Sequence, residues 1–293
     1  MRKVIVSVVA AALLGSTGLM AETSANVTSK AVKSAKAKAE SGKLKVIEEA
    51  VSAVVLTQNV IDALDKNDVE KAKSELEKAI GKLEIVLAHK DAPALLPIDS
   101  VITATEYMGD LKSIKETLSA VKKLLATKKV QEARRLLDTL QSEIDIVTVS
   151  LPLISYPQAL RLSARYLNEG KIKEAGDVLK MALDTLVRSE TIIPLPLLKA
   201  QALIEAAQKV AKSDKQQALK HLDAAKKELK IAEALGYTSG SDTTYKMLDD
   251  AIEAVEKEIR GKNRAEKLFE ELMEKLKEFK EKALKTVESK KSS

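Results

Sequence analysis

Residues 64–83 read LDKNDVEKAKSELEKAIGKL, and this stretch contains the pattern that decides the fold. A short polar turn is followed by Ala72 and then by apolar residues 4, 7 and 11 positions later. This spacing places the side chains along one face of an α-helix, with a small residue where a neighbouring helix can approach closely. Five segments share the spacing: Ala72, Leu76, Ala79 and Leu83; Ala133, Leu137, Leu140 and Ile144; Ala175, Leu179, Ala182 and Leu186; Ala218, Leu222, Ala225 and Leu229; Ala265, Phe269, Leu272 and Leu276.

Each of these stripes follows a polar turn, and another helical segment precedes each turn. Asn67, Gly170 and Gly261 suit the left-handed backbone conformation that ends a helix. Asp68 and Asp214 are typical helix N-caps. The repeating unit is therefore predicted to be an antiparallel helical hairpin. About five such units give an all-α fold, and both an open array and a compact bundle fit the pattern.

The six prolines support this plan, because they fall in pairs after the second helix of a hairpin. Proline ends one helix and is tolerated in the first turn of the next. The first two stripes lie further apart than the others, and we interpret residues 98–108 as an extra helical stretch between them. The pairs are Pro93 and Pro97, Pro152 and Pro157, and Pro194 and Pro196.

The C-terminal segment, residues 241–293, has a different character. Its apolar residues alternate in steps of three and four between Tyr245 and Ala283, which is typical of a coiled coil. Opposite charges four residues apart, such as Glu271 and Lys275, support a helix. The stripe could form a homodimer or fold back on the chain, and Gly261 interrupts it, which favours a C-terminal helical hairpin.

Composition excludes several classes of function. The chain has no Cys, no Trp, five Tyr and two Phe, so it contains no disulfide, thiol nucleophile or cysteine-ligated cluster and few aromatic platforms for single-stranded nucleic acid. Its 49 basic and 43 acidic residues are interleaved, which argues against a nucleic-acid partner. Neither His89 nor His221 has the Glu three residues before it that a bundle metal site needs. We expect no metal, no cofactor and no enzymatic activity.

The N-terminus reads as a signal peptide over residues 1–21. A basic Met1-Arg2-Lys3 precedes an apolar run, and cleavage is expected after Ala21. An uncleaved membrane anchor is the alternative, since the uncharged stretch is close to the length that spans a bilayer. With cleavage, we expect a periplasmic protein with no stable membrane insertion. Residues 22–43, rich in Lys, Ala and Ser, are predicted to be a flexible linker before a helical domain over residues 44–237.

Three segments together resemble one known family. They are Leu64 to Lys73 (LDKNDVEKAK), Ser100 to Tyr107 (SVITATEY) and Leu151 to Leu153 (LPL). In this order, after a signal peptide, they resemble the YfdX family of bacterial secreted proteins over residues 46–190. The resemblance implies a soluble periplasmic all-α protein associated with stress responses such as acid resistance and with chaperone-like behaviour. The family offers no catalytic motif to transfer, and the chain departs from its pattern beyond Ile193.

Two apolar loops flanked by proline are the candidate sites for partner proteins. One interpretation is an apolar groove that accepts a partner, and the other is packing between hairpins. We therefore expect a non-enzymatic, chaperone-like protein, with a tetratricopeptide-like scaffold for one defined partner or a carboxylate-based enzyme as alternatives. The candidate residues are Leu151, Leu153, Tyr156, Ile193, Leu195 and Leu197.

Overall fold

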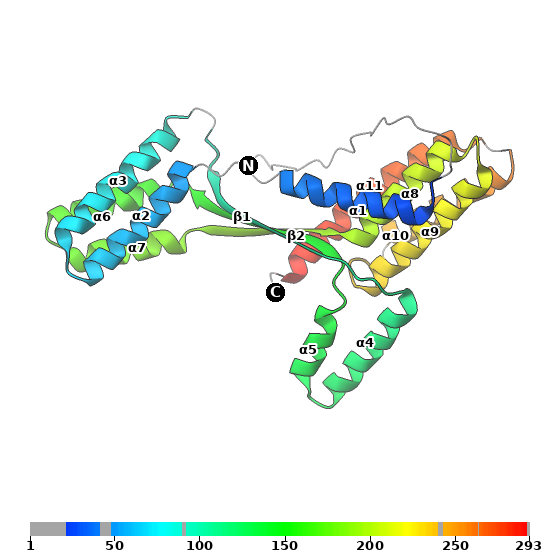
Figure 1. The fold of residues 1–293 in the computed structure, drawn as a ribbon, viewed down its shortest axis with the longest axis horizontal. Helices are drawn as coiled ribbons and strands as arrows, with labels where there is room; N and C mark the ends of the chain where they lie inside the picture. The colour runs from blue at the N-terminus through cyan, green and yellow to red at the C-terminus, as the bar shows by residue number, and fades with distance from the viewer. Residues whose placement is uncertain (1–21, 42–47, 90–91, 240–242, 263, 292–293) are drawn as a thin grey trace.

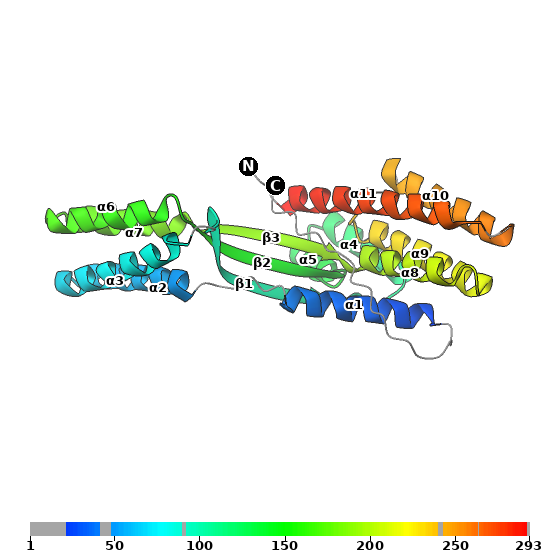
Figure 2. The same cartoon turned by 90° about the horizontal axis from the view of Figure 1, so that it is seen from above.

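A computed structural model describes residues 22–41, 48–89, 92–239, 243–262 and 264–291. In these ranges the chain forms eleven helices and three strands. Figures 1 and 2 show two helical bodies at opposite ends of an elongated molecule, with a narrow sheet between them. The predicted signal peptide lies outside the described residues. The mainly helical fold and the helical hairpins predicted from the sequence are confirmed.

The first helical body contains two hairpins that pack face to face. They consist of α2 (Glu48–Asp65), α3 (Val69–Leu87), α6 (Tyr156–Asn168) and α7 (Ile172–Asp184). The alanines and leucines of the predicted stripes in α3 and α7 are buried between the helices. Small residues in these stripes let the helix axes approach closely, so the core consists mainly of aliphatic side chains, with Tyr156 buried among them.

The second helical body contains α8 (Leu195–Val210), α9 (Lys215–Ala234), α10 (Thr243–Arg260) and α11 (Glu266–Lys291). The stripes of α9 and α11 are buried together in one core, which also takes residues of α8 and α10. The C-terminal hairpin therefore folds back on the chain. It shares its core with α8 and α9, so the expected boundary between residues 237 and 241 does not separate two cores.

A three-stranded antiparallel sheet links the two bodies. Its strands are β1 (Leu95–Thr105), β2 (Glu143–Pro152) and β3 (Val187–Pro194), with β2 in the middle. All three are rich in Val, Ile and Thr, which favour extended backbone. The register shifts between Pro97 and Asp99, which is where proline, lacking an N–H, is tolerated in a strand.

A third hairpin is inserted between β1 and β2. It consists of α4 (Leu111–Ala126) and α5 (Val130–Asp138) and projects away from the sheet in Figure 1. The two helices pack on each other, and the main contact beyond the hairpin joins α4 to α9.

The sheet corrects two details of the sequence interpretation. Residues 98–108 were expected to be helical, but most of them belong to β1. In the second stripe, Leu140 and Ile144 lie beyond the end of α5, and Ile144 is buried in β2. Leu186 likewise lies beyond α7. In each case a strand follows the hairpin directly, and its first apolar residues continue the spacing of the helix by coincidence.

The predicted flexible linker is also corrected. Within its described part, residues 22–41, the chain forms the helix α1 (Ser24–Ser41), which packs along α8 and beside β1. Ala and Lys are strong helix formers, so the composition that suggested disorder suits a helix equally well. Val27 and Val32 are buried, and small Ala35 and Ala39 continue the contact toward the sheet. Residues 42–47 lie outside the described part of the chain.

Most of the residues predicted to end or cap helices have the predicted conformation. Asn67 and Gly170 have φ of 58° and 76°, in the left-handed region. Asp68 accepts a hydrogen bond from the Lys71 backbone N–H at 3.1 Å, and Asp214 caps α9 in the same way. Gly261 does not have a positive φ, so its predicted left-handed conformation is wrong.

None of the described helices combines the length and the apolar character that a bilayer span requires.

One prediction concerns acid and the docking of α1. His221 of α9 is buried, and its Nδ1 lies 2.9 Å from Ser24 Oγ at the start of α1. Burial lowers the pKa of His221, while Glu22 and Asp214 oppose the shift. The neutral ring is thus favoured in the folded state, and its contribution to stability is lost as the pH falls below its unfolded pKa of about 6.5. We expect hydrogen-exchange protection of residues 24–41, corrected for intrinsic rates, to fall between pH 7 and pH 5.

The matched variant is His221→Gln, which keeps a polar group but does not titrate in this range. Its α1 should show the same protection at both pH values, and α3 should be unaffected in both proteins. Equal loss of α1 protection in the variant and the parent would contradict the assignment to His221.

Candidate functional site

The loop residues predicted to bind partners lie inside the protein. Five of the six are buried, and Ile193 is half-buried against the small core that joins α1 to the sheet. Leu151, Leu153 and Tyr156 belong to the core of the first body, and burial raises the pKa of the Tyr156 phenol to about 12. Leu195 and Leu197 lie where α8 meets the sheet and α1. These side chains therefore serve packing between elements, the alternative that the sequence left open.

Exposed apolar side chains occur at several places on the described surface, and three of them lie on the projecting α4–α5 hairpin. Leu125 and Val130 flank its turn and are 49% and 54% exposed, and Leu137 of α5 is 44% exposed. The hairpin buries Ile114, Val121 and Ala133 between its helices, and none of these belongs to the three larger cores. Two amphipathic helices without a third layer cannot cover their apolar faces, so this surface remains open to a partner.

The root of this hairpin is held by a compact polar arrangement. Asp110 is the N-cap of α4 and accepts hydrogen bonds from the Ser113 backbone N–H and Oγ, both at 2.8 Å. Ser113 Oγ also accepts bonds from the Asp110 backbone N–H at 3.0 Å and from the Tyr107 hydroxyl at 2.9 Å. These bonds lower the pKa of Asp110, so its carboxylate stays ionised. A Cβ on Gly109 would lie 2.6 Å from Ser113 Oγ, so only glycine fits without displacement.

A half-buried charge cluster ties the same root to the second body. Glu106, between β1 and α4, pairs with Lys199 of α8 at 2.9 Å, and only 14% of the Lys199 side chain is exposed. Glu228 of α9 faces both groups. Burial raises the pKa of Glu228, Lys199 opposes the shift, and Glu106 adds to it. A second carboxylate thus lies near the Glu106–Lys199 ion pair at this joint.

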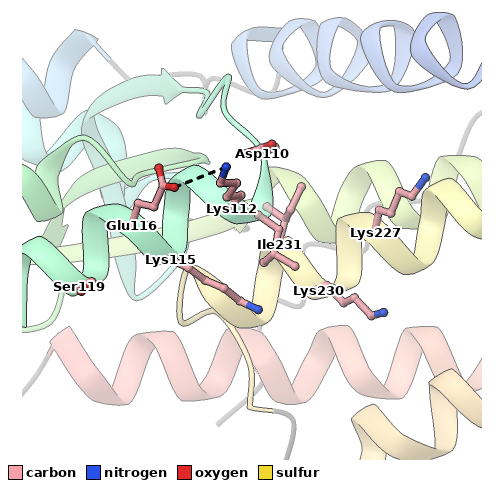
Figure 3. A pocket seen from close by; sticks show the side chains of 9 residues that line it. Asp110, Lys112, Lys115, Glu116, Ser119, Lys227, Lys230 and Ile231 are labelled. Carbon is pink, nitrogen blue, oxygen red and sulfur yellow. Dashed lines mark ion pairs between the residues drawn. The ribbon is translucent and has the colours of Figure 1, made fainter.

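Beside the root, a cleft of about 780 Å³ separates α4 from α9. Four lysines line it, and Ile231 lies between the two pairs in Figure 3. Lys112 pairs with Glu116 at 3.9 Å, and Lys227 pairs with Asp223 at 2.7 Å. Within the described ranges, Lys115 and Lys230 form no ion pair. The cleft therefore combines an apolar floor with a surplus of positive charge.

The Ser24–His221 contact is not arranged for nucleophilic catalysis. Gln217 Nε2 donates to the Glu22 backbone carbonyl at 3.1 Å, which fixes the amide orientation, and it lies 3.2 Å from His221 Nε2. His221 Nε2 is thus the acceptor, and Nδ1 carries the proton and donates it to Ser24 Oγ. An imidazole in this tautomer cannot take the serine proton at Nδ1. Among the described residues, no group of three or more His, Asp or Glu could hold a metal ion.

The sequence reasoning missed both the hairpin surface and the cleft. One signal was available: Lys112 and Lys115 on α4, like Lys227 and Lys230 on α9, are three residues apart and so share a helix face. The approach of the two helices depends on tertiary packing, for which no local pattern exists.

Replacing Gly109 by Ala should loosen the hairpin root. The new methyl group must displace the Tyr107 hydroxyl or Ser113 Oγ, and overpacking of this kind typically destabilises by about 1–3 kcal/mol. We expect reduced hydrogen-exchange protection of α4 and α5. The control is Gly81→Ala in α3, where no atom lies within 4 Å of the added Cβ and the helix should gain slightly in stability. Unchanged protection of α4 in the Gly109 variant would show that the root tolerates the methyl group.

Replacing Glu228 by Gln should stabilise the protein near neutral pH. Because the folded state raises the pKa of Glu228, its contribution to stability is present below the unfolded pKa and is lost as the pH rises through the folded pKa. Urea unfolding should therefore show a higher free energy of unfolding for the variant at pH 7 and little difference at pH 4. The control is Glu270→Gln, which replaces an exposed carboxylate of α11 and should change the stability little at either pH. An effect of Glu228→Gln that does not depend on pH would contradict the prediction.

Comparison with known proteins gives three results. No curated protein matches the chain. A solved structure of YfdX from Salmonella Typhi is 18% identical, and the similarity covers 51% of this chain and 93% of the other with a TM-score of 0.36. The family model described as YfdX protein matches residues 53–192, from α2 through the sheet to β3 and including the α4–α5 hairpin. Residues 53–192 of this chain therefore match the YfdX family, in agreement with the resemblance found in the sequence.

Proposed function

We propose that this protein is a non-enzymatic, periplasmic, stress-associated binder of other proteins with chaperone-like behaviour. The observation that carries the proposal is the apolar surface of the α4–α5 hairpin, which projects from the molecule and packs on little besides itself. The resemblance of the chain to a family of secreted stress proteins supports the periplasmic location and the association with stress. Partner proteins would contact the hairpin at Leu125, Val130 and Leu137.

The chemistry of this surface favours broad and weak contact. Its exposed side chains are aliphatic, and no Trp is available in the chain as a strong anchor. High-affinity interfaces usually concentrate their binding energy in buried Trp, Tyr or Arg. Aliphatic patches instead gain free energy roughly in proportion to the apolar area they bury, about 25 cal/mol per Å² and with little regard to partner sequence. Such a surface suits many partly unfolded clients better than one specific receptor.

The proposal predicts that the full mature chain suppresses aggregation of unrelated proteins. Heat-treated citrate synthase and reduced insulin are suitable clients, monitored by light scattering. The double variant Leu125→Ser, Leu137→Ser should lose most of the suppression, because it removes apolar area from both helices of the hairpin.

The matched control is Val55→Ser, Ile85→Ser on the first helical body, where the two side chains are 54% and 52% exposed. It removes a similar apolar area elsewhere and should retain the suppression. Equal loss in both double variants would show that the hairpin has no special role. One stoichiometric crosslinked partner without any suppression would instead identify a scaffold, the tetratricopeptide-like alternative.

A further inference from the structure

We propose that the cleft between α4 and α9 binds a free, single-chain anionic amphiphile, namely a long-chain carboxylate. Nothing in the proposed client-binding surface requires this cleft, because the exposed hairpin residues lie outside its lining. The proposal therefore stands independently of the chaperone-like function. It rests on the volume, the apolar floor and the charges of the cleft.

The floor of the cleft can take an aliphatic chain. Leu111 of α4 and Ile231 of α9 are half-buried there, and the methylene stems of the lysines extend the apolar lining. Its volume of about 780 Å³ lies within the range of roughly 300–1,000 Å³ that small-ligand pockets occupy.

The charges of the cleft select an anion. Four lysines face two carboxylates, and both carboxylates are already engaged: Asp110 caps α4 and Glu116 pairs with Lys112. Lys115 and Lys230 remain to bind an anionic head group, one from each helix. A carboxylate held between two ammonium groups gains charge-assisted hydrogen bonds on both oxygens.

The shape argues for one aliphatic chain. The cleft lies between the sides of two helices and is lined by side chains of both, which suits a monomeric amphiphile. Its two walls also come from different parts of the chain: α4 lies within the YfdX match at residues 53–192, whereas α9 lies beyond it. The cleft is therefore formed jointly with the C-terminal helices and is not contained in the matched region.

The test is calorimetric titration of the full mature chain with oleate below its critical micelle concentration. We expect saturable binding of one molecule per chain. Lys115→Gln, Lys230→Gln should weaken it by about tenfold, since both head-group contacts are removed. Ile231→Ser should also weaken it. Lys71→Gln, Lys173→Gln removes the same number of charges from exposed positions of the first helical body, away from the cleft, and should leave binding unchanged.

Four outcomes would overturn the proposal. Absence of oleate binding by a folded chain would do so directly. Equal binding of uncharged monoolein would show that the lysines do not select an anion. Displacement of oleate by octaglutamate at similar concentration would identify a site for acidic peptides instead. Binding to phosphatidylglycerol vesicles, lost in the Lys115/Lys230 variant and seen without binding of monomeric oleate, would identify a membrane contact.

Discussion

The backbone hydrogen-bond ladder of β2 is the constraint on which the arrangement of the molecule depends. β2 pairs with β1 from Glu143 to Pro152 and with β3 from Glu143 to Ser150, so both of its edges are satisfied. The chain passes between the two helical bodies along these three strands. Because the strands are antiparallel and their pairing is continuous apart from the shift between Pro97 and Asp99, the ladder fixes the separation and the relative direction of the bodies. The apolar ends of the strands, such as Leu96 and Leu151, then anchor the sheet in the first core.

The same ladder explains why the α4–α5 hairpin projects. β1 and β2 are paired as far as Thr105 and Glu143, so the segment between them leaves and re-enters the sheet at the same end. A hairpin inserted there has no strand to follow, and its main contact with the rest of the described chain is that of α4 with α9. Its apolar faces consequently remain half covered, although its helix caps and its internal contacts are as regular as those of the other hairpins. The exposed surface follows from topology and not from an unusual sequence.

The helical hairpins could be predicted from the sequence because a helix repeats its signal over three turns. Ala72 to Leu83 gives four consistent positions, and a turn with Asn67 and Asp68 marks the boundary. The strands were missed because each begins shortly after a helical hairpin. An apolar residue of the strand, such as Ile144, then falls at the spacing of the helical stripe and makes the predicted helix longer than the observed one. The density of β-branched residues in IVTV, residues 146–149, was the available signal. The helix α1 was missed because its packed face has only two large apolar residues, Val27 and Val32, and continues with small Ala35 and Ala39. Such a composition is not distinguished from that of a polar linker.

The binding surfaces could not be predicted, because apolar side chains in a sequence indicate burial more reliably than function. The six candidate residues of the proline-flanked loops proved to be buried or half-buried, whereas their neighbour Ile154 is exposed. The exposed patch and the cleft arose where tertiary packing ends. Basic and acidic residues are interleaved along the sequence, so no basic cluster is apparent there. Folding nevertheless brings the lysine pairs of α4 and α9 to one cleft. At the hairpin root, Glu106–Lys199 and the Asp110 cap fix the direction of α4 through polar contacts. Such contacts are directional, so they can hold the hairpin in place while leaving its apolar tip uncovered.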